Sequence, residues 1–472
     1  MRPAVVHHGA RSVALDAQAI PWVGRIVAGG AAFAAGIGLT RAGHPLVLAL
    51  LPVVGTLAIA GALTWPRWCL VAALFLLVAY VPDVLVTHSA AHAVTAVVLA
   101  GAVLRRALAI ERLAVPGEMV VFGALALAYV AAAIFATDRP AATAETLDLV
   151  SYAAVVALLV TLLDSPSWMR RAVWAIVLGV GLLAVLAIVQ QVTHSYAASY
   201  GGFASILPAG HANRSAGPLN PNPFGQVLAT SAVLAVYLAA VERRLAGRAL
   251  AGALAVVCVA GVTYTQSRAA LIALLIVALA AGVLRGIRLR VLAVAACGVV
   301  VLGSLVLPVG LQTRVGALYA AVSSNAGTPQ DPSLRGRESE NLAGLRMWAD
   351  HPLIGVGPDN FEVHYAEYAQ AIGTDSRAEQ RGAHNLYLEA LAETGLLGAL
   401  AFFGVLWLAL AGAWRARRRL RGHDALLAEG ILVALGAFLI CALTLHSAYA
   451  RYEWIFLGLG LAAGRLARRR SA

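Results

Sequence analysis

Long apolar runs recur along this chain from about Trp22 almost to its end, and they restrict the possible folds more than any other feature. A run of about 20 apolar residues crosses the roughly 30 Å hydrocarbon layer of a bilayer as a helix. Because no water satisfies backbone amides there, each run must form its own helical hydrogen bonds. The chain has 472 residues, 61% of them apolar, and a mean hydropathy of +0.81. We therefore expect an all-α polytopic membrane protein.

Arginine clusters and prolines divide the apolar runs into about 12 to 14 transmembrane helices. The proline-rich stretch from Gly43 to Val86 accounts for the range, because its segments are either full spans or a broken, re-entrant pair. Either count places both termini on the same side of the membrane. The candidate spans lie near 22–39, 44–63, 68–82, 88–104, 118–136, 147–163, 172–191, 223–241, 249–265, 269–284, 291–309, 392–413, 427–446 and 453–466.

The net charge of +12 comes from arginines that lie between the spans. They are not collected on one soluble face with interleaved aromatic residues, which argues against nucleic acid as a partner. The positive-inside rule places such clusters, and with them both termini, in the cytoplasm. The clusters are Arg105/Arg106/Arg112, Arg170/Arg171, Arg243/Arg244/Arg248, Arg285/Arg288/Arg290, 415–421 and 465–470.

With the arginine-rich connections inside, the other connections face the periplasm or exterior. They include a short one from Thr137 to Glu145 and one large loop with two segments of helical character, 338–349 and 360–371. A long loop with helices of its own is more often functional than idle. The predicted organisation is a cytoplasmic tail at 1–21, transmembrane helices at 22–309 with a medium periplasmic loop at 193–222, a large helical periplasmic loop at 310–391, transmembrane helices at 392–466 and a basic cytoplasmic tail at 467–472.

His384 stands where the large loop leads back into an apolar helix. His384 itself or Asn385 is suited to cap that helix. The positive end of the helix dipole disfavours an imidazolium ion, and a neutral imidazole accepts a proton from an attacking hydroxyl. The alternative is a boundary histidine that only hydrogen-bonds a loop carbonyl. Gly395 and Gly398, farther along the helix, predict close packing against another span.

Arginines at the predicted outer boundary are candidate anion contacts. Arg268 falls in a tight turn between two spans, where a charge is often functional, and its planar fork suits a phosphate. Gln266 in the same turn is a further candidate contact. Arg214 lies in a Pro- and Asn-rich segment, with Asn222 as the predicted cap of the next helix. For Arg268 the alternative is an arginine that only anchors the helix at the interface.

Arg346 is the third candidate arginine, on the first helical segment of the large loop. Its alternative is a structural partner for acids such as Glu340 or Asp350.

Several familiar reaction motifs are absent from the sequence. It has no Gly-rich phosphate loop with lysine, no His-Glu-x-x-His, no Cys-x-x-Cys and no Gly-x-Ser-x-Gly. No tight Asp-x-Asp pair is predicted outside to hold a divalent metal. We therefore expect no metal and no other cofactor, with the energy of any reaction coming from the substrate.

Three groups of residues resemble the O-antigen ligase and polymerase superfamily of bacterial envelope glycosyltransferases. His384-Asn385, nine residues and then Gly395-x-x-Gly398 is similar to a histidine pattern of that superfamily. Ser267-Arg268-Ala269-Ala270 at a span start is similar to it as well, and so is Arg346-x-Trp348 followed by 352–357. The resemblance extends from roughly Thr193 to the C-terminus.

The resemblance implies transfer of a glycan from undecaprenyl pyrophosphate to a sugar hydroxyl of the lipid A core, at the periplasmic face of the bacterial inner membrane. It implies that His384 is the catalytic base and that Arg268 and Arg346 contact the pyrophosphate. Arg214, Asn385 and Gln266 are further candidate contacts to pyrophosphate or acceptor. Direct attack at the anomeric carbon predicts inversion, since no second carboxylate is positioned for a covalent intermediate.

Other functions stay open at the level of the sequence. Within the superfamily, the alternative to an O-antigen ligase is the polymerase that extends the glycan on its lipid carrier, and then a protein O-oligosaccharyltransferase. From a different class comes a transporter of lipid-linked sugars. A transporter is expected to have charges at the bilayer midplane and internal repeats, whereas the candidate residues here cluster at one face.

Overall fold

The computed structural model describes residues 60–85, 89–108, 116–209, 212–288, 290–292, 294, 332–373, 381–445 and 450–470. The chain divides into two compact units, one of Met1–Cys69 and Val97–Ala114 and the other of Leu70–Ala96 and Val115–Ala472. The second unit contains every candidate site residue. The predicted tail at 1–21 and the predicted spans 22–39, 44–63 and 291–309 lie wholly or mostly outside the described residues.

The described part of the chain is mostly helical, as predicted. Its helices are α3 (Pro66–Val78), α4 (Val81–Leu85), α5 (Ser89–Leu108), α6 (Met119–Phe135), α7 (Arg139–Leu162), α8 (Pro166–Val192), the short 3-10 helix η1 (Tyr200–Gly202), α9 (Pro221–Val241), α10 (Leu245–Thr265), α11 (Arg268–Leu284), α14 (Pro332–Asp350), α15 (Phe361–Ile372), α16 (Leu386–Arg419), α17 (Gly422–Ala442) and α18 (Arg451–Arg469).

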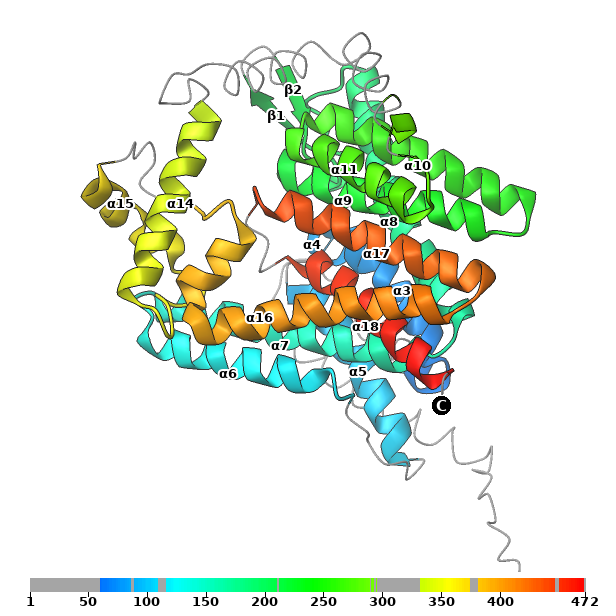
Figure 1. The fold of residues 1–472 in the computed structure, drawn as a ribbon, viewed down its shortest axis with the longest axis horizontal. Helices are drawn as coiled ribbons and strands as arrows, with labels where there is room; N and C mark the ends of the chain where they lie inside the picture. Colours follow the sequence, from blue (N-terminus) through cyan, green and yellow to red (C-terminus); the bar gives the residue numbers. More distant parts are fainter. Residues whose placement is uncertain are drawn as a thin grey trace, which may run out of the picture. The chain divides into compact units, whose positions relative to one another are not determined.

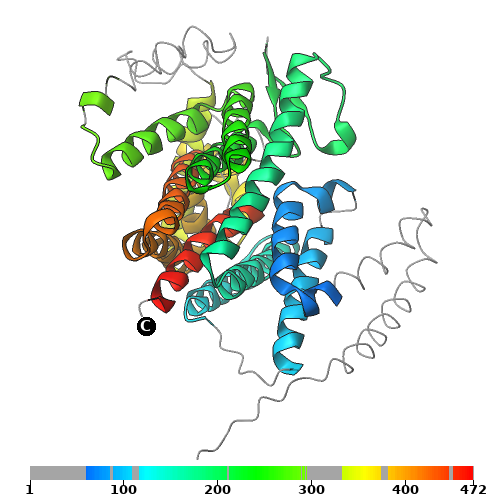
Figure 2. The same ribbon diagram turned by 90° about the vertical axis from the view of Figure 1, so that its right-hand side faces the viewer.

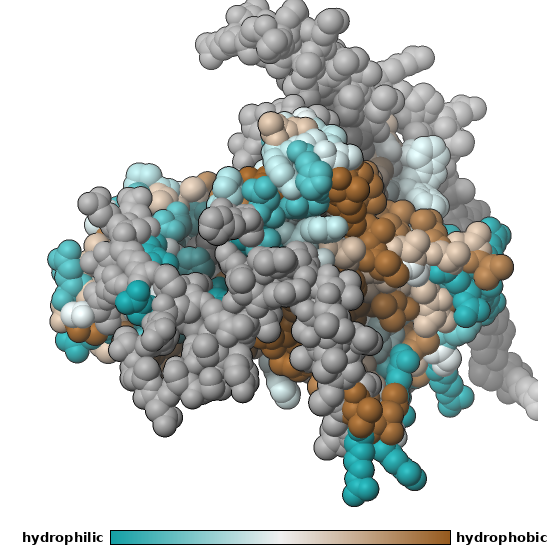
Figure 3. All heavy atoms as spheres, turned by 90° about the horizontal axis from the view of Figure 1, so that it is seen from above, coloured by the Kyte–Doolittle hydropathy of each residue, from teal (hydrophilic) through white to brown (hydrophobic). Residues whose placement is uncertain are grey.

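Six of these helices are long and apolar enough to cross a membrane, namely α7, α8, α9, α10, α16 and α17. Shorter apolar helices include α3, α6 and α11. In Figure 3 the apolar residues gather over the middle of the helix bundle and hydrophilic residues lie toward its ends. The multi-pass membrane character is therefore confirmed, while the count of 12 to 14 spans and the cytoplasmic termini stay predictions.

Helix α18 lies at the centre of the bundle. It packs against α16, α17 and α7, and Figures 1 and 2 show it (red) between them. Nearly all of its residues are buried, among them Trp454, Tyr452 and Phe456. A central helix is covered by protein instead of lipid, which explains why it tolerates the charged residues Arg451 and Glu453 near its start.

Two details differ from the sequence predictions. The 193–222 region is not wholly without strands, since β1 (Ile206–Ala209) and β2 (Ala212–Ser215) form an antiparallel pair. Helix α7 begins at Arg139, so the expected outside loop to Glu145 is much shorter. Asp138 explains this early start, because its side chain accepts a hydrogen bond from Ala141 N–H and caps the helix.

The bundle has two distinct ends. At one end lie the connections from α7 to α8, α9 to α10 and α16 to α17, in or beside which the predicted cytoplasmic arginines lie. There Glu429 accepts hydrogen bonds from Tyr237 Oη at 2.9 Å and from Arg285 and Arg417 at 3.0 Å each. At the other end lie the turn from α10 to α11, the β hairpin, α14, α15 and the start of α16.

Candidate functional site

His384 lies in the short segment that precedes α16, and its ring lies beside a carbonyl oxygen and a carboxylate oxygen. Its Nδ1 is 3.2 Å from Glu340 Oε2 and 3.0 Å from the Gly382 carbonyl oxygen. Its backbone has a positive φ of 39°, a conformation that few residues other than glycine adopt. The side chain is 31% exposed, so the ring is supported by protein and still reaches solvent.

Glu340 is the residue that organises this segment. It projects from α14 and its side chain is fully buried. Arg381 Nη2 lies 2.7 Å from Glu340 Oε1, while His384 lies at Oε2. A buried carboxylate is costly unless it is paired. Each Glu340 oxygen lies within ion-pair distance of a basic side chain, although neither oxygen accepts a hydrogen bond from the described residues. Glu340 thus joins the segment before α16 to α14.

A small apolar core holds these polar groups in place. It consists of Ala343, Met347, Val356, Phe361, Tyr365, Ala369, Ala383 and Ala392. These residues come from α14, α15, α16 and the segments between them, so the described part of the large loop is packed around its own core. Ala383, next to His384, is only 1% exposed. The position of His384 is therefore set by packing as well as by polar contacts.

Asn385 caps α16, one of the two residues that the sequence offered for this position. Its Oδ1 accepts hydrogen bonds from the backbone N–H groups of Tyr387 and Leu388, at 3.2 and 3.3 Å. Its Nδ2 lies 3.4 Å from Asn341 Oδ1 on α14. Asn385 thus starts the helix and contacts the residue next to Glu340.

The atoms nearest to Gly395 and Gly398 belong to a loop and to α16 itself, where the sequence predicted another span. Gly395 breaks α16, with φ 60° and ψ −165°, and a Cβ there would lie 2.3 Å from Leu353 C. A Cβ on Gly398 would lie 2.1 Å from Oγ1 of Thr394, in the preceding turn of the same helix. The prediction failed because it assumed a straight helix, whereas the glycines make room for a loop crossing and the resulting break.

The loop that crosses α16 at this break is the segment 352–357, which we call the strap. Its backbone exchanges four hydrogen bonds with α16. Val356 and Gly357 donate to the carbonyls of Ala392 and Glu393, at 3.0 and 2.9 Å. In return, Leu396 and Leu397 donate to the carbonyls of Pro352 and Leu353, at 2.8 and 3.2 Å. Two motifs that are distant in sequence, the strap and the glycine pair, are therefore a single structural unit.

The strap leads into α15, which is anchored to the turn between α6 and α7. Asn360 Oδ1 accepts from Asp138 N–H at 2.7 Å, and Thr137 Oγ1 lies 3.1 Å from His364 Nε2. Burial lowers the pKa of His364, and nearby His351 lowers it further, against an opposing effect of Glu367. Two connections predicted to lie outside the membrane thus contact each other.

The turn between α10 and α11 holds Gln266 and Arg268. Gln266 has a positive φ of 53° and is 5% exposed. Its Oε1 has no hydrogen-bond partner among the described residues, although buried polar atoms are usually paired. Ser267 caps α11 through a 3.4 Å contact with Ala270 N–H, and Arg268 is the first residue of that helix.

Arg214 connects the β hairpin to the same turn. Its Nε donates to the Thr265 carbonyl at 3.0 Å and its Nη2 donates to Asn222 Oδ1 at 2.6 Å. The cap position of α9 is Asn220, not Asn222 as predicted. The helix already begins at Pro221, so Asn222 lies within its first turn. Asn222 instead positions Arg214.

A continuous series of contacts joins the arginine turn to the His384 segment. A Cβ on Gly225 of α9 would lie 2.8 Å from Ser267 Cβ, so this helix touches the turn. The next residue, Gln226, donates to the Phe438 carbonyl at 3.0 Å. Tyr387, near the start of α16, donates to the adjacent Leu439 carbonyl at 2.7 Å. Helices α9 and α17 therefore bridge the two parts of the candidate site.

Arg346 lies apart from this arrangement. It is six positions after Glu340, which places it about 240° around an α-helix, on a different face of α14. Its Nε is 3.3 Å from Asp350 Oδ2, and its side chain is 62% exposed. The sequence suggested Glu340 or Asp350 as a structural partner of Arg346, and the structure shows the ion pair with Asp350.

The His384 arrangement is suited to proton transfer. Nδ1 hydrogen-bonds the Gly382 carbonyl oxygen, which can only accept, so Nδ1 carries the proton and a neutral ring has its lone pair on Nε2. A carboxylate on Nδ1 orients the ring and stabilises the imidazolium that forms when Nε2 accepts a proton.

The sequence did not identify Glu340 and Arg381 as site residues. For Glu340, the spacing of buried positions on its helix was an available signal. Glu340, Ala343 and Met347 have the i, i+3, i+7 spacing of a buried helix face, so a carboxylate stands within an apolar stripe. A charge in such a stripe indicates a paired, often functional group. Nothing in the sequence alone paired it with His384.

Part of the chain is similar to known proteins. Residues 253–403 match the family model described as O-antigen ligase, a range that includes Arg268, the strap, His384 and the glycine pair. The chain is also 32% identical over 120 residues to the teichuronic acid biosynthesis protein TuaE of Bacillus subtilis (strain 168). That match covers 25% of this chain and only 23% of the relative. The resemblance seen in the sequence is thereby confirmed over residues 253–403, the part of the chain that matches the O-antigen ligase family model.

Proposed function

We propose that this protein is an O-antigen ligase, a metal-independent, inverting glycosyltransferase that moves a polysaccharide from undecaprenyl pyrophosphate to a sugar hydroxyl of the lipid A core. The observation that carries the proposal is the Glu340 carboxylate 3.2 Å from His384 Nδ1, inside the region matched by the family model. A histidine oriented in this way is equipped to act as a general base.

In the proposed step the acceptor oxygen attacks the anomeric carbon of the donor glycan. A new carbon–oxygen bond forms while the bond from that carbon to the pyrophosphate oxygen breaks. The hydroxyl proton moves to His384 Nε2, and undecaprenyl pyrophosphate leaves with the bonding electron pair. Glu340 then faces the imidazolium and stabilises its charge.

Arg268 is proposed to receive the pyrophosphate, and Gln266 is proposed to contact the substrate beside it. A guanidinium at the start of α11 and the positive end of that helix both favour an anion. The buried Gln266 Oε1 without a partner offers an acceptor for a substrate hydroxyl. Arg214, fixed on Thr265 and Asn222, supports the turn and adds positive charge. Arg346 is a weaker candidate, because Asp350 offsets its charge, and Asn385 serves mainly to place His384.

The proposed location is the bacterial inner membrane, with the active site facing the periplasm. This assignment is supported by the separation of the two bundle ends. The predicted cytoplasmic arginines surround one end, whereas His384, Arg268 and Arg214 belong to the other. Undecaprenyl-linked donor, lipid A core and bilayer are then the partners of the protein.

The second candidate is the polymerase that extends the glycan on its lipid carrier. It uses the same donor and the same proton transfer, and differs only in its acceptor. This candidate is retained because the similar protein TuaE is named for teichuronic acid biosynthesis and not for ligation.

Substitution of His384 tests the proposal in a purified system with lipid-linked polysaccharide as donor and rough lipopolysaccharide as acceptor. We expect His384→Ala to insert and fold normally but to reduce transfer at least about 100-fold, the range of general base catalysis. His351→Ala is the matched control, because His351 is an exposed histidine in the same region, and its transfer rate should equal that of the unsubstituted protein.

Normal transfer by His384→Ala would overturn the catalytic assignment. In cells, the same variant should accumulate lipid-linked polymer if the protein is a ligase. Accumulation of short lipid-linked units instead would identify the polymerase.

A further inference from the structure

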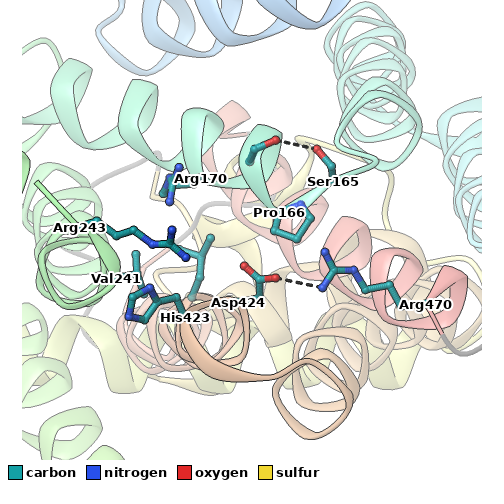
Figure 4. A pocket seen from close by; sticks show the side chains of 10 residues that line it. Ser165, Pro166, Arg170, Val241, Arg243, His423, Asp424 and Arg470 are labelled. Carbon is teal, nitrogen blue, oxygen red and sulfur yellow. Dashed lines mark hydrogen bonds and ion pairs between the residues drawn. The ribbon is translucent and has the colours of Figure 1, made fainter.

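A pocket of about 450 Å³ lies at the end of the bundle opposite to His384. Figure 4 shows that side chains from several helices converge on it. Arg170 comes from α8, Arg243 from the connection between α9 and α10, and Arg470 from the end of α18, while α17 contributes His423 and Asp424. Its apolar wall includes Val241 and Leu427.

The charge inside this pocket is positive and incompletely paired. Arg470 Nη1 lies 3.0 Å from Asp424 Oδ2, and Arg170 Nε lies 3.5 Å from Glu242 Oε1. Arg243 and His423 make no hydrogen bond or ion pair with the described part of the chain. A single lining carboxylate therefore faces the guanidinium groups of Arg170, Arg243 and Arg470.

Two helix starts add to the positive potential. Helix α8 begins at Pro166 and α17 at Gly422, and neither has a side-chain cap. Ser165 and Ser167 bring hydroxyl groups to the same wall, with their Oγ atoms 2.9 Å apart. Backbone N–H groups and hydroxyls at helix starts, together with guanidinium groups, are the donors that bind phosphate oxygens in proteins.

The height of the pocket in the membrane limits what can reach it. It is formed where α8, α9 and α17, all long enough to span, reach their ends. Helix ends of this kind lie at the level of lipid headgroups. Basic pockets between helices on the cytoplasmic side are known to receive the headgroups of anionic lipids, and the apolar wall of Val241 and Leu427 suits the glycerol and upper acyl carbons.

We propose that this pocket binds the phosphodiester headgroup of an anionic phospholipid from the leaflet at the arginine-rich end of the bundle. Arg243 supplies the principal contact, with Arg170 and Arg470 on either side of the phosphate. The site is separate from the proposed catalytic end and does not depend on the glycosyl transfer.

The test uses the full chain, purified in a nonionic detergent, depleted of lipid and titrated with phosphatidylglycerol or phosphatidylcholine under native mass spectrometry. We expect tighter binding of phosphatidylglycerol, weakened about fivefold by Arg243→Gln, the effect of one arginine near an anionic headgroup. Arg248→Gln is the matched control, since it removes an exposed arginine from the same end that does not line the pocket. Its affinity should be unchanged.

Equal losses in Arg243→Gln and Arg248→Gln would overturn the proposal in favour of general surface charge. Unchanged binding in Arg243→Gln would overturn it as well. Complete displacement of phosphatidylglycerol by inorganic phosphate at equal concentration would show a free phosphate site instead of a lipid site. Because Arg243 is exposed and has no partner among the described residues, its substitution should leave the fold intact.

Discussion

His384 adopts a backbone conformation that most residues avoid, with φ at 39°. Such conformations cost about 1 to 3 kcal/mol and persist where the surroundings enforce them. Here the enforcing contacts are Glu340 and Gly382 on the ring, the buried Ala383 before it and the Asn385 cap after it. These contacts fix the direction in which the His384 side chain points.

Glu340 is expected to act through His384 and not on the substrate. Glu340→Gln keeps the size of the side chain but removes the charge that stabilises the imidazolium. We expect kcat to fall about 100-fold or more, as for other histidine-orienting carboxylates, with little change in the KM for the donor.

A double variant provides the decisive comparison. If Glu340 acts through His384, Glu340→Gln should lower activity no further when His384 is already alanine, because residues that act as a unit are not additive. Glu338→Gln is the control, since Glu338 is exposed on the same helix. A full additional loss in the double variant would assign Glu340 an independent role.

Arg268 is expected to act on the donor through its planar fork. Arg268→Ala should raise the KM for the lipid-linked donor about tenfold or more, and Arg268→Lys should raise it less, because lysine keeps the charge but loses the paired hydrogen bonds. Steady-state kinetics over a range of donor concentrations measures both. Equal activity of all three proteins would leave Arg268 as a membrane anchor.

At the scale of elements, the strap and α16 form one backbone-bonded unit. The break at Gly395 exposes backbone groups of α16, and the strap satisfies them. Gly355 faces the same crossing, since a Cβ there would lie 2.3 Å from Glu393 C. Both glycines are thus required by close approach of two backbones.

Gly395→Ala should destabilise the protein strongly. Its φ and ψ lie in a region that is almost exclusive to glycine, and the new Cβ would collide with Leu353. We expect a loss of about 3 kcal/mol or more, measured as a lower melting temperature in detergent. Gly252→Ala is the control, because no heavy atom lies within 4 Å of its Cβ position. It should be neutral or slightly stabilising.

The sequence predicted the elements better than their contacts. Continuous apolar runs located α8 to α11 and α16 to α18, and the polar stretch before α16 located His384 and Asn385. The break at Gly395 was not predictable, because its cause is the strap, a segment remote in sequence. Glu340 was hidden for the same reason, since its partner lies on another element. Arg214 and Asn222 show how a cap assigned from residue type gives way to a tertiary contact.

At the scale of the whole molecule, the two bundle ends should face opposite sides of the membrane. Ala197, in the connection from α8 to α9, and Ala246, near the start of α10, are both exposed and belong to opposite ends. In intact cells with a permeable outer membrane, a maleimide that cannot cross the inner membrane should label Ala197→Cys but not Ala246→Cys. Lysis should make both reactive.

In the described part of the chain, native cysteines should add little background labelling, because Cys258 and Cys441 are buried and Cys69 is partly buried. The reverse labelling pattern would invert the assignment of the two ends and place His384 in the cytoplasm.

The break in α16 has a mechanical consequence. A continuous helix transmits tilt along its whole length, so changes in bilayer thickness would reach any residue at its tip. In α16 the segment before Gly395 is bonded to the strap and to α14, while the segment after it passes through the bundle. Lipid-driven tilting of the long segment should therefore be absorbed at Gly395, leaving the distance between His384 and Glu340 independent of membrane thickness.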